Sequence, residues 1–377
     1  MTTCLWLVCT LFAIIGSAYA LLAAVLVARF VAQTKPLLRR SEDVTILKPL
    51  HGAEAELATN LESFCAQDYS GQIELVCGVQ NPDDPAALFV QNLRARFPER
   101  NISLARGSNA AARNPKIANV INMLPLAHHD VFILSDSDIH VEPDYVQGVV
   151  AALQQPQVGL VTCLYRGRAV GGFWSRMAAA AVDQHFLPSV LVGLKFGLAR
   201  PCFGSTIALR KSTLERIGGF EAFADTLADD YAMGDAVRRL GQKVAIPPFT
   251  VGHTSADSSF SELITHELRW ARTIRLVDPA GYAGLLLTHP LPFALAGIAL
   301  SGFSAIAVII LVGTLASRLF VPIQVERLPG GGKNSLWLSP LRDLISFAVF
   351  VASFVPGPVD WRGRSYRVDS DGSVTPT

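Results

Sequence analysis

Residues 130–139 read DVFILSDSDI, an apolar run that opens directly onto two carboxylates. The run 131–134 predicts a strand that is buried on both faces of a parallel sheet. In open α/β sheets ligands bind beyond the carboxyl ends of the strands, where Asp136 and Asp138 stand. Two neighbouring carboxylates repel each other unless a cation such as Mg²⁺, which also binds phosphate oxygens, compensates them. The stretch therefore predicts a metal and phosphate site, with a solvated Asp-Ser-Asp turn as the alternative.

Strands and helices alternate in the sequence that precedes this stretch. Apolar runs at 44–47, 73–79 and 102–104 are separated by helical patterns. This order predicts an α/β domain with a doubly wound, mostly parallel sheet. The run 73–79 is also followed by an acidic pair, Asp83-Asp84, for which a proline-flanked turn is the alternative interpretation. If both strand ends lie at the same edge of the sheet, one nucleotide could contact both acidic pairs.

A third acidic pair, Asp229-Asp230, opens a helical pattern at 232–240. Carboxylates at a helix N-terminus complement the helix dipole and cap free N–H groups, which is their ordinary role. The same position would also hold a catalytic base on a well-defined backbone. The residues alone leave both interpretations open.

The segment 266–275 reads HELRWARTIR and predicts a helix rich in positive charge. His266, Arg269 and Trp270 lie on adjacent faces of such a helix. Arg269 and Arg272 could offer charge to a diphosphate, and Trp270 could offer a ring to a sugar or base. Taken alone, the segment favours the alternative of a membrane-proximal basic helix.

The composition indicates a membrane protein. Of the 377 residues, 50% are hydrophobic and only 17% are charged, against about 25% in typical soluble domains. The net charge of +1 argues against nucleic acid as a partner. The six cysteines form no CxxC motif, and Cys65, Cys77 and Cys163 stand in apolar surroundings. These three predict free thiols in a reducing compartment.

Two long apolar stretches predict membrane helices. Residues 4–28 are uncharged and about long enough to cross a bilayer. No basic segment precedes them, so an uncleaved anchor is favoured over a signal peptide. The basic residues at 29–40 place the following domain in the cytoplasm. Residues 285–322, with Arg318 as their only charge, predict two helices that break near 301–302, or one long tilted helix.

Two shorter apolar stretches allow several interpretations. Residues 185–198 are too short and interrupted to span, so they either lie at the membrane interface or are buried. Residues 336–355 contain Arg342 and Asp343, which predicts a span with a buried ion pair or a re-entrant hairpin. The basic tail favours a cytoplasmic C-terminus, which requires an odd number of crossings if the N-terminus is external. The predicted parts are an N-terminal transmembrane anchor at 1–30, a cytoplasmic α/β domain at 41–280, membrane helices at 281–358 and a basic cytoplasmic tail at 359–377.

The order of these motifs resembles a known family. An Asp pair, a DxD, an Asp-Asp-Tyr and an Arg-Trp helix on an α/β domain with membrane segments resemble the ceramide glucosyltransferase type of membrane glycosyltransferase. That type belongs to a large inverting family that also holds cellulose and hyaluronan synthases. The resemblance runs from Lys48-Pro49-Leu50 to residues 361–367, and it implies a GT-A-like fold. Residues 161–168 and 266–270 are most similar to bacterial hopanoid-biosynthesis glycosyltransferases.

The resemblance implies roles for the first two acidic motifs. Asp83 or Asp84, with Asp84 preferred, is expected to contact the uracil or ribose, and Lys116 is placed among the residues that bind the nucleotide-sugar. Asp136 is expected to bind the donor and, with Asp138, to hold Mg²⁺ or Mn²⁺ as a DxD motif. Animal ceramide glucosyltransferases carry Gly where Asp138 stands.

The resemblance also implies the catalytic group. Asp230 is the expected general base, with Asp229 beside it. In the family's final motif, Gln or Arg followed by x-x-Arg-Trp, this chain keeps Arg269 and Trp270 but has His266 in the first position. A histidine there can still donate to a diphosphate oxygen.

The resemblance implies a reaction and a place for it. The expected activity is inverting transfer of N-acetylglucosamine or glucose from a UDP-sugar to the hydroxyl of a membrane lipid. A hopanoid such as bacteriohopanetetrol is the favoured acceptor, ceramide is the alternative, and a polyprenyl-phosphate or polysaccharide acceptor ranks below both. The bacterial inner membrane is the expected location, with the catalytic domain in the cytoplasm and no nucleic acid as partner. A non-enzymatic binding module would be expected to lack at least one of the carboxylates.

Overall fold

The computed structural model describes residues 2–107, 112–333 and 336–355, and the backbone of three short strands beyond them, 359–361, 364–368 and 374–376. The chain forms two compact units. The sheet unit comprises Thr34–Tyr165, Arg200–Thr254 and Tyr366–Thr377, and the helical unit comprises Met1–Gln33, Arg166–Ala199 and Ser255–Ser365. Each unit takes in segments that are far apart in the sequence, and the domain boundaries expected from the sequence remain predictions.

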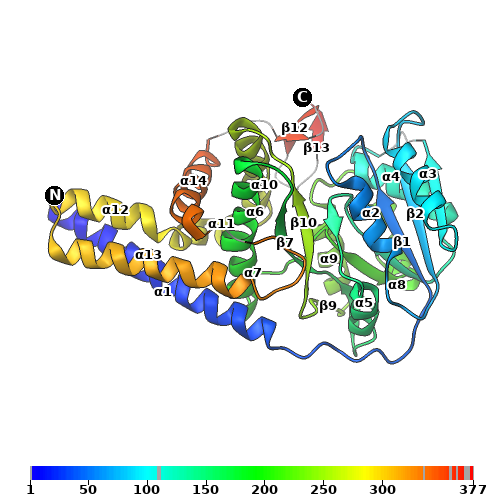
Figure 1. Cartoon of the computed structure of the whole chain (residues 1–377), viewed down its shortest axis with the longest axis horizontal. Helices are drawn as coiled ribbons and strands as arrows, with labels where there is room; N and C mark the ends of the chain where they lie inside the picture. The colour runs from blue at the N-terminus through cyan, green and yellow to red at the C-terminus, as the bar shows by residue number, and fades with distance from the viewer. Residues whose placement is uncertain are drawn as a thin grey trace. The chain divides into compact units, whose positions relative to one another are not determined.

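A seven-stranded sheet forms the centre of the sheet unit, in the order β3-β2-β1-β4-β8-β6-β9. Figure 1 labels β1, β2 and β9 among its strands. The strands are β1 (Val44–Pro49), β2 (Ile73–Val79), β3 (Asn101–Arg106), β4 (Val131–Leu134), β6 (Val158–Val161), β8 (Ile207–Arg210) and β9 (Lys243–Ala245). The pairs β3-β2, β2-β1, β1-β4 and β6-β9 are parallel, while β8 runs antiparallel to both β4 and β6. The mostly parallel α/β fold expected from the sequence is therefore confirmed.

Helices cover both faces of this sheet, which explains its continuous apolar strands. Val131 and Ile133 of β4 face one core cluster, and Phe132 and Leu134 face the other. The first cluster packs against α2 (Leu57–Cys65), α3 (Ala86–Arg96) and α5 (Tyr145–Leu153), and the second against α4 (Pro115–Met123), α8 (Lys211–Arg216) and α9 (Asp229–Arg239). Cys65, Cys77, Cys163 and Cys202 are buried and unbridged, as the free-thiol prediction requires.

The antiparallel strand β8 brings a loop to the carboxyl edge of the sheet. Its first residue pairs with the last residue of β4, Ile207 with Leu134. The chain must therefore enter β8 from the edge where β4 ends, and the preceding residues lie beside Asp136. The backbone N–H of Asp136 donates to the carbonyl of Gly204 at 3.1 Å. A second sheet, β5-β10-β7, contains β5 (Ile139–His140), β7 (Leu164–Ala169) and β10 (Thr250–Ser255).

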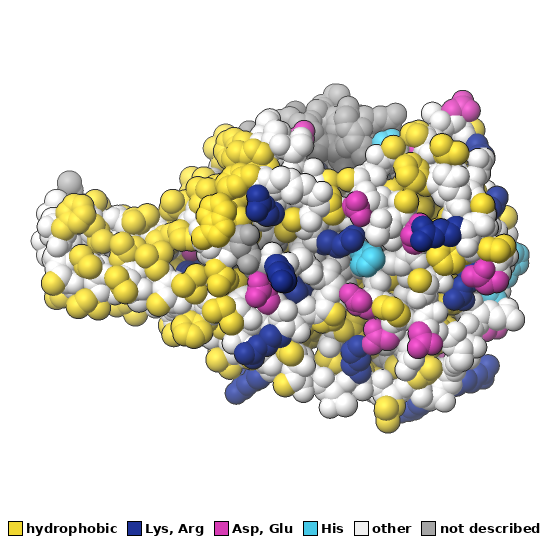
Figure 2. All heavy atoms as spheres, viewed as in Figure 1, with side chains coloured by type: hydrophobic (Ala, Val, Ile, Leu, Met, Phe, Trp, Pro, Cys, Tyr) yellow, Lys and Arg dark blue, Asp and Glu magenta, His cyan; other side chains and the backbone are white. Residues whose placement is uncertain are grey.

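In the helical unit, α1 (Thr2–Val31) packs along α12 (Pro290–Leu300) and α13 (Ala305–Val325) (Figure 1). The rings of Phe12 and Phe293 stack at 4.8 Å, and Ser17 and Thr314 share a hydrogen bond of 3.0 Å. Hydrophobic side chains cover much of the outer surface of these helices (Figure 2). The break between α12 and α13 confirms the two-helix interpretation of residues 285–322. Apolar residues that face outward are what a lipid environment requires.

Three described helices are long and apolar enough to cross a membrane, namely Thr2–Val31, Phe173–Lys195 and Ala305–Val325. A bent pair, Pro279–Thr288 with Pro290–Leu300, makes up to four if it forms one span. Residues 185–198 were expected to be too short to span, but in the structure most of them continue a helix that begins at Phe173. A π-helix, η2 (Val182–Phe186), joins α6 (Phe173–Ala181) to α7 (Leu187–Lys195), so the helical segment runs on without a break.

The segment 336–355 forms η5 (Leu336–Leu338) and the short helix α14 (Ser339–Ala352). Arg342 and Asp343 are both fully buried, but each pairs with a residue elsewhere in the helical unit. Arg342 forms a bidentate pair with Glu267, and Asp343 pairs with Arg318. The ion pair expected within this segment is thus replaced by two ion pairs to other helices, because neighbouring residues on a helix point in different directions.

At the C-terminal end the backbone forms β11 (Val359–Trp361), β12 (Arg364–Val368) and β13 (Val374–Pro376) as a small sheet. The basic tail predicted there rests on Arg362, Arg364 and Arg367. Arg362 and the side chains of the other two lie outside the described residues.

Candidate active site

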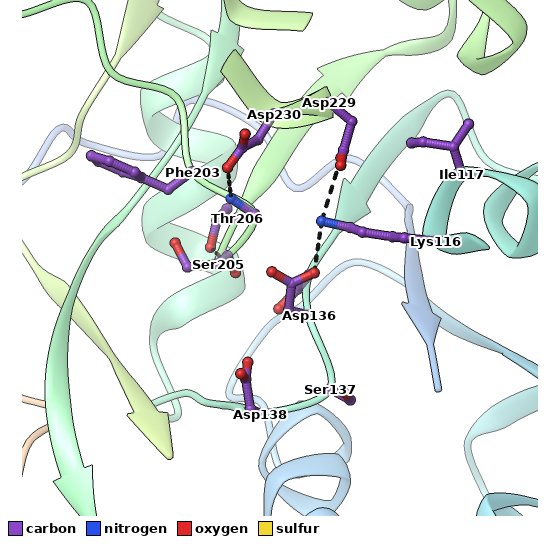
Figure 3. Close-up of polar contacts among 12 residues, drawn as sticks. Lys116, Ile117, Asp136, Ser137, Asp138, Phe203, Ser205, Thr206, Asp229 and Asp230 are labelled. Carbon is purple, nitrogen blue, oxygen red and sulfur yellow. Dashed lines mark hydrogen bonds and ion pairs between the residues drawn. The ribbon is translucent and has the colours of Figure 1, made fainter. Parts of the chain in front are cut away.

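Lys116 is the central cation of the candidate site. Asn114 caps α4, since its side chain accepts from the backbone N–H groups of Lys116 and Ile117 at 2.9 and 3.2 Å. The lysine follows Pro115 in the first turn, and its Nζ lies 2.7 Å from Oδ1 of Asp136 and 3.4 Å from Oδ2 of Asp229 (Figure 3). Burial alone would lower the pKa of Lys116, but the surrounding carboxylates raise it above its usual value. A permanently charged ammonium therefore joins the two predicted acidic motifs.

Asp230, the expected base, is held by two backbone N–H groups. It lies in the first turn of α9, and its two carboxylate oxygens accept from the backbone N–H groups of Gly204 at 2.9 Å and Tyr231 at 2.7 Å (Figure 3). Burial and the negative charge of Asp229 raise the pKa of Asp230 to about 6. Burial likewise raises the pKa of Asp136. Asp230 is thus held in one orientation and is unprotonated near neutral pH.

Asp229 differs from its neighbour. It is only 5% exposed, and it accepts from the Asn114 amide at 3.2 Å besides its pair with Lys116. The structure brings Lys116, Asp136, Asp229 and Asp230 together at one edge of the sheet (Figure 3). Their roles in catalysis and donor binding remain predictions.

Gly204 is a site residue that the sequence analysis missed. A Cβ atom at this position would lie 2.3 Å from Oδ2 of Asp136 and 2.8 Å from Nζ of Lys116. Only glycine lets the backbone approach the charged side chains this closely. The Gly-Ser-Thr run before β8 is the sequence signal that could have drawn attention to it.

Lys48 is a second missed residue, at the end of β1. It is fully buried, it donates to the backbone carbonyl of Asp136, and its Nζ lies 3.4 Å from Oγ of Ser135 and 4.0 Å from the centre of the Phe64 ring. Burial lowers the pKa of Lys48 to about 8. The buried ammonium of Lys48 holds the backbone of the Asp-Ser-Asp turn in place, so Lys48 is a positioning residue.

Asp138 lies beside His253, a third missed residue. Strand β10 pairs with β5, placing His253 opposite Ile139, and Oδ2 of Asp138 is 3.3 Å from Nε2 of His253. A carboxylate and an imidazole suit Mn²⁺ and tolerate Mg²⁺, and two protein ligands leave positions for phosphate oxygens. No group of three or more His, Cys, Asp or Glu side chains around a common metal position is found among the described residues. Metal binding at the Asp-Ser-Asp turn therefore remains a prediction.

Asp83 and Asp84 follow β2 at the same edge of the sheet, because β2, β1 and β4 are parallel neighbours. Asp83 is exposed, whereas Asp84 is 7% exposed. Oδ1 of Asp84 accepts from the backbone N–H groups of Gly52 and Ala86, both at 2.9 Å. Asp84 thereby fastens the turn after β1 to the start of α3, and its expected contact with a nucleotide remains a prediction.

The remaining predicted residues lie on α10 (Phe260–Val277) in the helical unit. The rings of His266 and Trp270 meet edge to face at 4.4 Å, and Nδ1 of His266 is 3.4 Å from Oδ1 of Asp257. Arg272 donates to the carbonyl of Val355 at 3.5 Å. Arg269 lies one turn from His266 and Arg272, so the helix holds the predicted group together on its own.

Comparisons with known proteins identify the family of the chain. Residues 8–374 match the family described as glycosyl transferase family 21. Ceramide glucosyltransferase 3 of Caenorhabditis elegans is 25% identical over 357 residues, covering 88% of this chain and 74% of that protein. Ceramide glucosyltransferase 1 of the same organism is 23% identical over 354 residues, covering 88% and 72%.

A solved structure shares the fold. The mannosyltransferase PcManGT from Pyrobaculum calidifontis, in complex with GDP-Man and Mn²⁺, superposes with a TM-score of 0.57 at 20% identity, covering 92% of this chain and 98% of that one. The GT-A-like fold expected from the sequence is confirmed by this likeness. Since the family match extends over almost the entire chain, the protein belongs to glycosyl transferase family 21.

Proposed function

We propose that the protein transfers a sugar from a UDP-sugar to a hydroxyl group of a membrane lipid, with inversion at the anomeric carbon. The observation that carries this proposal is the carboxylate of Asp230, fixed by the Gly204 N–H at the carboxyl edge of a GT-A-like sheet. Membership of a glycosyltransferase family, candidate membrane helices and relatives named ceramide glucosyltransferases support the two substrate classes.

Asp230 would act as the general base. An acceptor hydroxyl is a poor nucleophile, and it becomes a good one as its proton passes to a carboxylate within hydrogen-bond reach. The hydroxyl oxygen then forms a bond to the anomeric carbon while the bond from that carbon to the diphosphate oxygen breaks. UDP leaves with the bonding electron pair, and the α-linked donor gives a β-glycoside. A single displacement needs no second carboxylate as nucleophile.

The departing diphosphate carries concentrated negative charge, and several residues would stabilise it. Arg269, Arg272 and His266 offer donors from α10, while Trp270 offers a ring to the sugar or base. A Mg²⁺ or Mn²⁺ ion held by Asp138 and His253 would add positive charge at the phosphate oxygens.

On the sheet unit, Asp136 and Lys116 would line the donor site. Lys116 balances the charge of Asp136, so the second carboxylate of the Asp-Ser-Asp turn is the better placed metal ligand. Asp83 and Asp84 would contact the uracil or ribose, as the family resemblance implies.

Two acceptors are supported by different arguments. The resemblance of residues 161–168 and 266–270 to hopanoid-biosynthesis glycosyltransferases implies a bacteriohopanetetrol-like acceptor with N-acetylglucosamine as donor. The relatives named ceramide glucosyltransferases favour ceramide with glucose. The basic residues after α1 favour a cytoplasmic sheet unit, and the family resemblance implies the inner membrane of a bacterium.

Mass spectrometry of total lipids would test the proposal. Cells that produce the wild-type protein, Asp230→Asn or Asp235→Asn are compared; Asp235 lies on the same helix and pairs with Arg239. A hexosamine-bearing hopanoid present with the wild type and Asp235→Asn, and absent with Asp230→Asn, establishes reaction and acceptor. A hexosylceramide with the same dependence keeps the mechanism and replaces the acceptor. Full transferase activity of folded Asp230→Asn overturns the mechanism.

A further inference from the structure

A buried polar cluster lies inside the helical unit, on helices that the proposed mechanism does not use. Its members are Gln184, His185, His289, Arg318 and Asp343. Arg318 donates to both carboxylate oxygens of Asp343, at 2.8 and 2.5 Å. Nε2 of His185 is 3.0 Å from Oδ1 of Asp343 and 3.1 Å from Nη2 of Arg318, and the rings of His185 and His289 stack at 5.5 Å.

The histidines and Gln184 stand where helices are irregular. Gln184 and His185 belong to the π-helix η2, a form that is rare and concentrated at functional sites. His289 is the residue between η4 (Leu285–Thr288) and α12, where the two helical segments are bent by 53°. In membrane proteins such breaks are tolerated where they are buried in protein or line a polar cavity, and they often carry substrate sites.

Several polar atoms of this cluster lack a partner. Within the part of the chain that the structure describes, no hydrogen-bond partner reaches Nε2 or Oε1 of Gln184, Nδ1 of His185 or Nδ1 of His289. Gln184 is 1% exposed and His289 is 5% exposed. Buried polar groups are almost always hydrogen-bonded, so four such atoms on three neighbouring side chains indicate a ligand that supplies the missing bonds.

The charge balance of the cluster defines the ligand. Asp343 neutralises Arg318, and Glu267 neutralises the nearby Arg342 through a bidentate pair at 2.6 and 2.7 Å. Both arginines that the structure describes here are thus paired with a carboxylate, whereas a phosphate would need an unpaired cation. An uncharged imidazole at His185 would offer a donor or an acceptor at Nδ1, depending on whether Nε2 faces Arg318 or Asp343. A hydroxyl group both donates and accepts, so it satisfies either tautomer and both ends of the Gln184 amide.

We propose that this cluster binds a hydroxyl group of the neutral lipid acceptor, a group other than the one that is glycosylated. The inference rests on the proposed function and adds the binding site for the acceptor. Gln184 and His185 lie in the candidate span Phe173–Lys195, Arg318 lies in the candidate span Ala305–Val325, and His289 lies at the bend of the bent pair. The site is therefore carried by the helices that are apolar enough to meet lipid. Ceramide and a hopanoid polyol share the hydroxyl chemistry, and an anionic polyprenyl phosphate lacks it.

Steady-state kinetics of the full chain in mixed micelles would test the inference. The variants are Gln184→Leu and His289→Phe, with Thr314→Val as the matched control, since Thr314 is equally buried in this unit but already hydrogen-bonded to Ser17. The acceptors are ceramide and bacteriohopanetetrol, each beside an analogue that lacks one non-reacting hydroxyl. UDP affinity is measured by calorimetry, and thermal unfolding reports the fold.

The expected result is a rise of about tenfold or more in the acceptor KM of both cluster variants, because a tenfold change corresponds to one hydrogen bond of ordinary strength. UDP affinity and the control variant should not change. Wild-type protein should show the same rise with the deoxy analogue, and the variants should show no additional rise, because ligand hydroxyl and side chain form one interaction. Whichever parent lipid shows this pattern is the source of the hydroxyl.

Two outcomes overturn the inference and one overturns the proposed function instead. Folded variants whose acceptor KM stays within about twofold of wild type contradict the site. If the variants do not fold, the wild-type protein still tests the site, because an unchanged wild-type KM for every deoxy analogue contradicts the proposed hydroxyl site as well. Wild-type protein that transfers sugar to neither lipid class refutes the proposed function, whatever the cluster binds.

Discussion

The acid side of the pH–rate profile tests the role of Asp230 directly. A general base must be unprotonated, and the pKa of Asp230 is raised to about 6 by burial and by the charge of Asp229. At pH 7 about nine-tenths of such a group is unprotonated, and at pH 5 about one-tenth, so kcat/KM should fall about tenfold between them. With an ordinary aspartate pKa near 3.8, the same change would lower the rate by less than about a tenth.

Asp229→Asn should move this acid limb to lower pH, because it removes the negative charge that disfavours ionisation of Asp230. Asp230→Asn should lose a factor of about 10²–10⁴ in rate and abolish the limb. The assay is transfer of radiolabelled sugar to lipid from pH 4.5 to 8, with unfolding checked at each pH. A wild-type limb at pH 4.5 or below, or a limb at the same pH in Asp229→Asn, would refute the assignment of the base.

Three further predictions concern other parts of the molecule. His253→Asn should raise the Mn²⁺ concentration for half-maximal transferase activity by about tenfold or more, and an unchanged metal titration would exclude it as a ligand. Burial alone would raise the pKa of Glu74, but hydrogen bonds from His128 and Thr45 lower it. Glu74→Gln should therefore lower the free energy of unfolding by about 1.5–3 kcal/mol at pH 7. The stability difference between wild type and Glu74→Gln should shrink as the pH falls below the usual glutamate pKa and through the lowered pKa of Glu74, because the wild-type carboxylate is then protonated as well. Denaturant titrations at pH 7 and 3.5 would measure this difference. Gly16→Ala should destabilise the helical unit by about 1–3 kcal/mol, since its Cβ would lie 2.8 Å from Pro290, whereas Gly313→Ala, with open space around it, serves as the control in detergent unfolding.

The strands at the centre of the sheet and the acidic motifs could be predicted from the sequence. Continuous apolar runs such as 73–79 and 131–134 predict buried parallel strands, and an acidic pair directly after such a strand must lie at its carboxyl edge. The helix from Phe260 to Val277 and the break between α12 and α13 follow from local pattern in the same way. The structure of residues 185–198 was harder to predict, because a π-helix at 182–186 joins them to the preceding helix and a π-helix has no sequence pattern of its own.

What remained depended on contacts between residues far apart in the chain. His253 reaches Asp138 only because β10 pairs with β5, and Gly204 reaches Asp136 only because β8 returns antiparallel from the carboxyl edge.

The choice of Arg318, rather than the adjacent Arg342, as the partner of Asp343 is likewise set by helix packing. The sequence by itself determined which segments form the central parallel strands and the long apolar helices at 2–31 and 305–325, and which carboxylates end the strands, because these depend on local hydrophobic pattern. The tertiary structure alone decided which charge meets which, because side-chain pairing depends on strand register and helix contacts that no local pattern encodes.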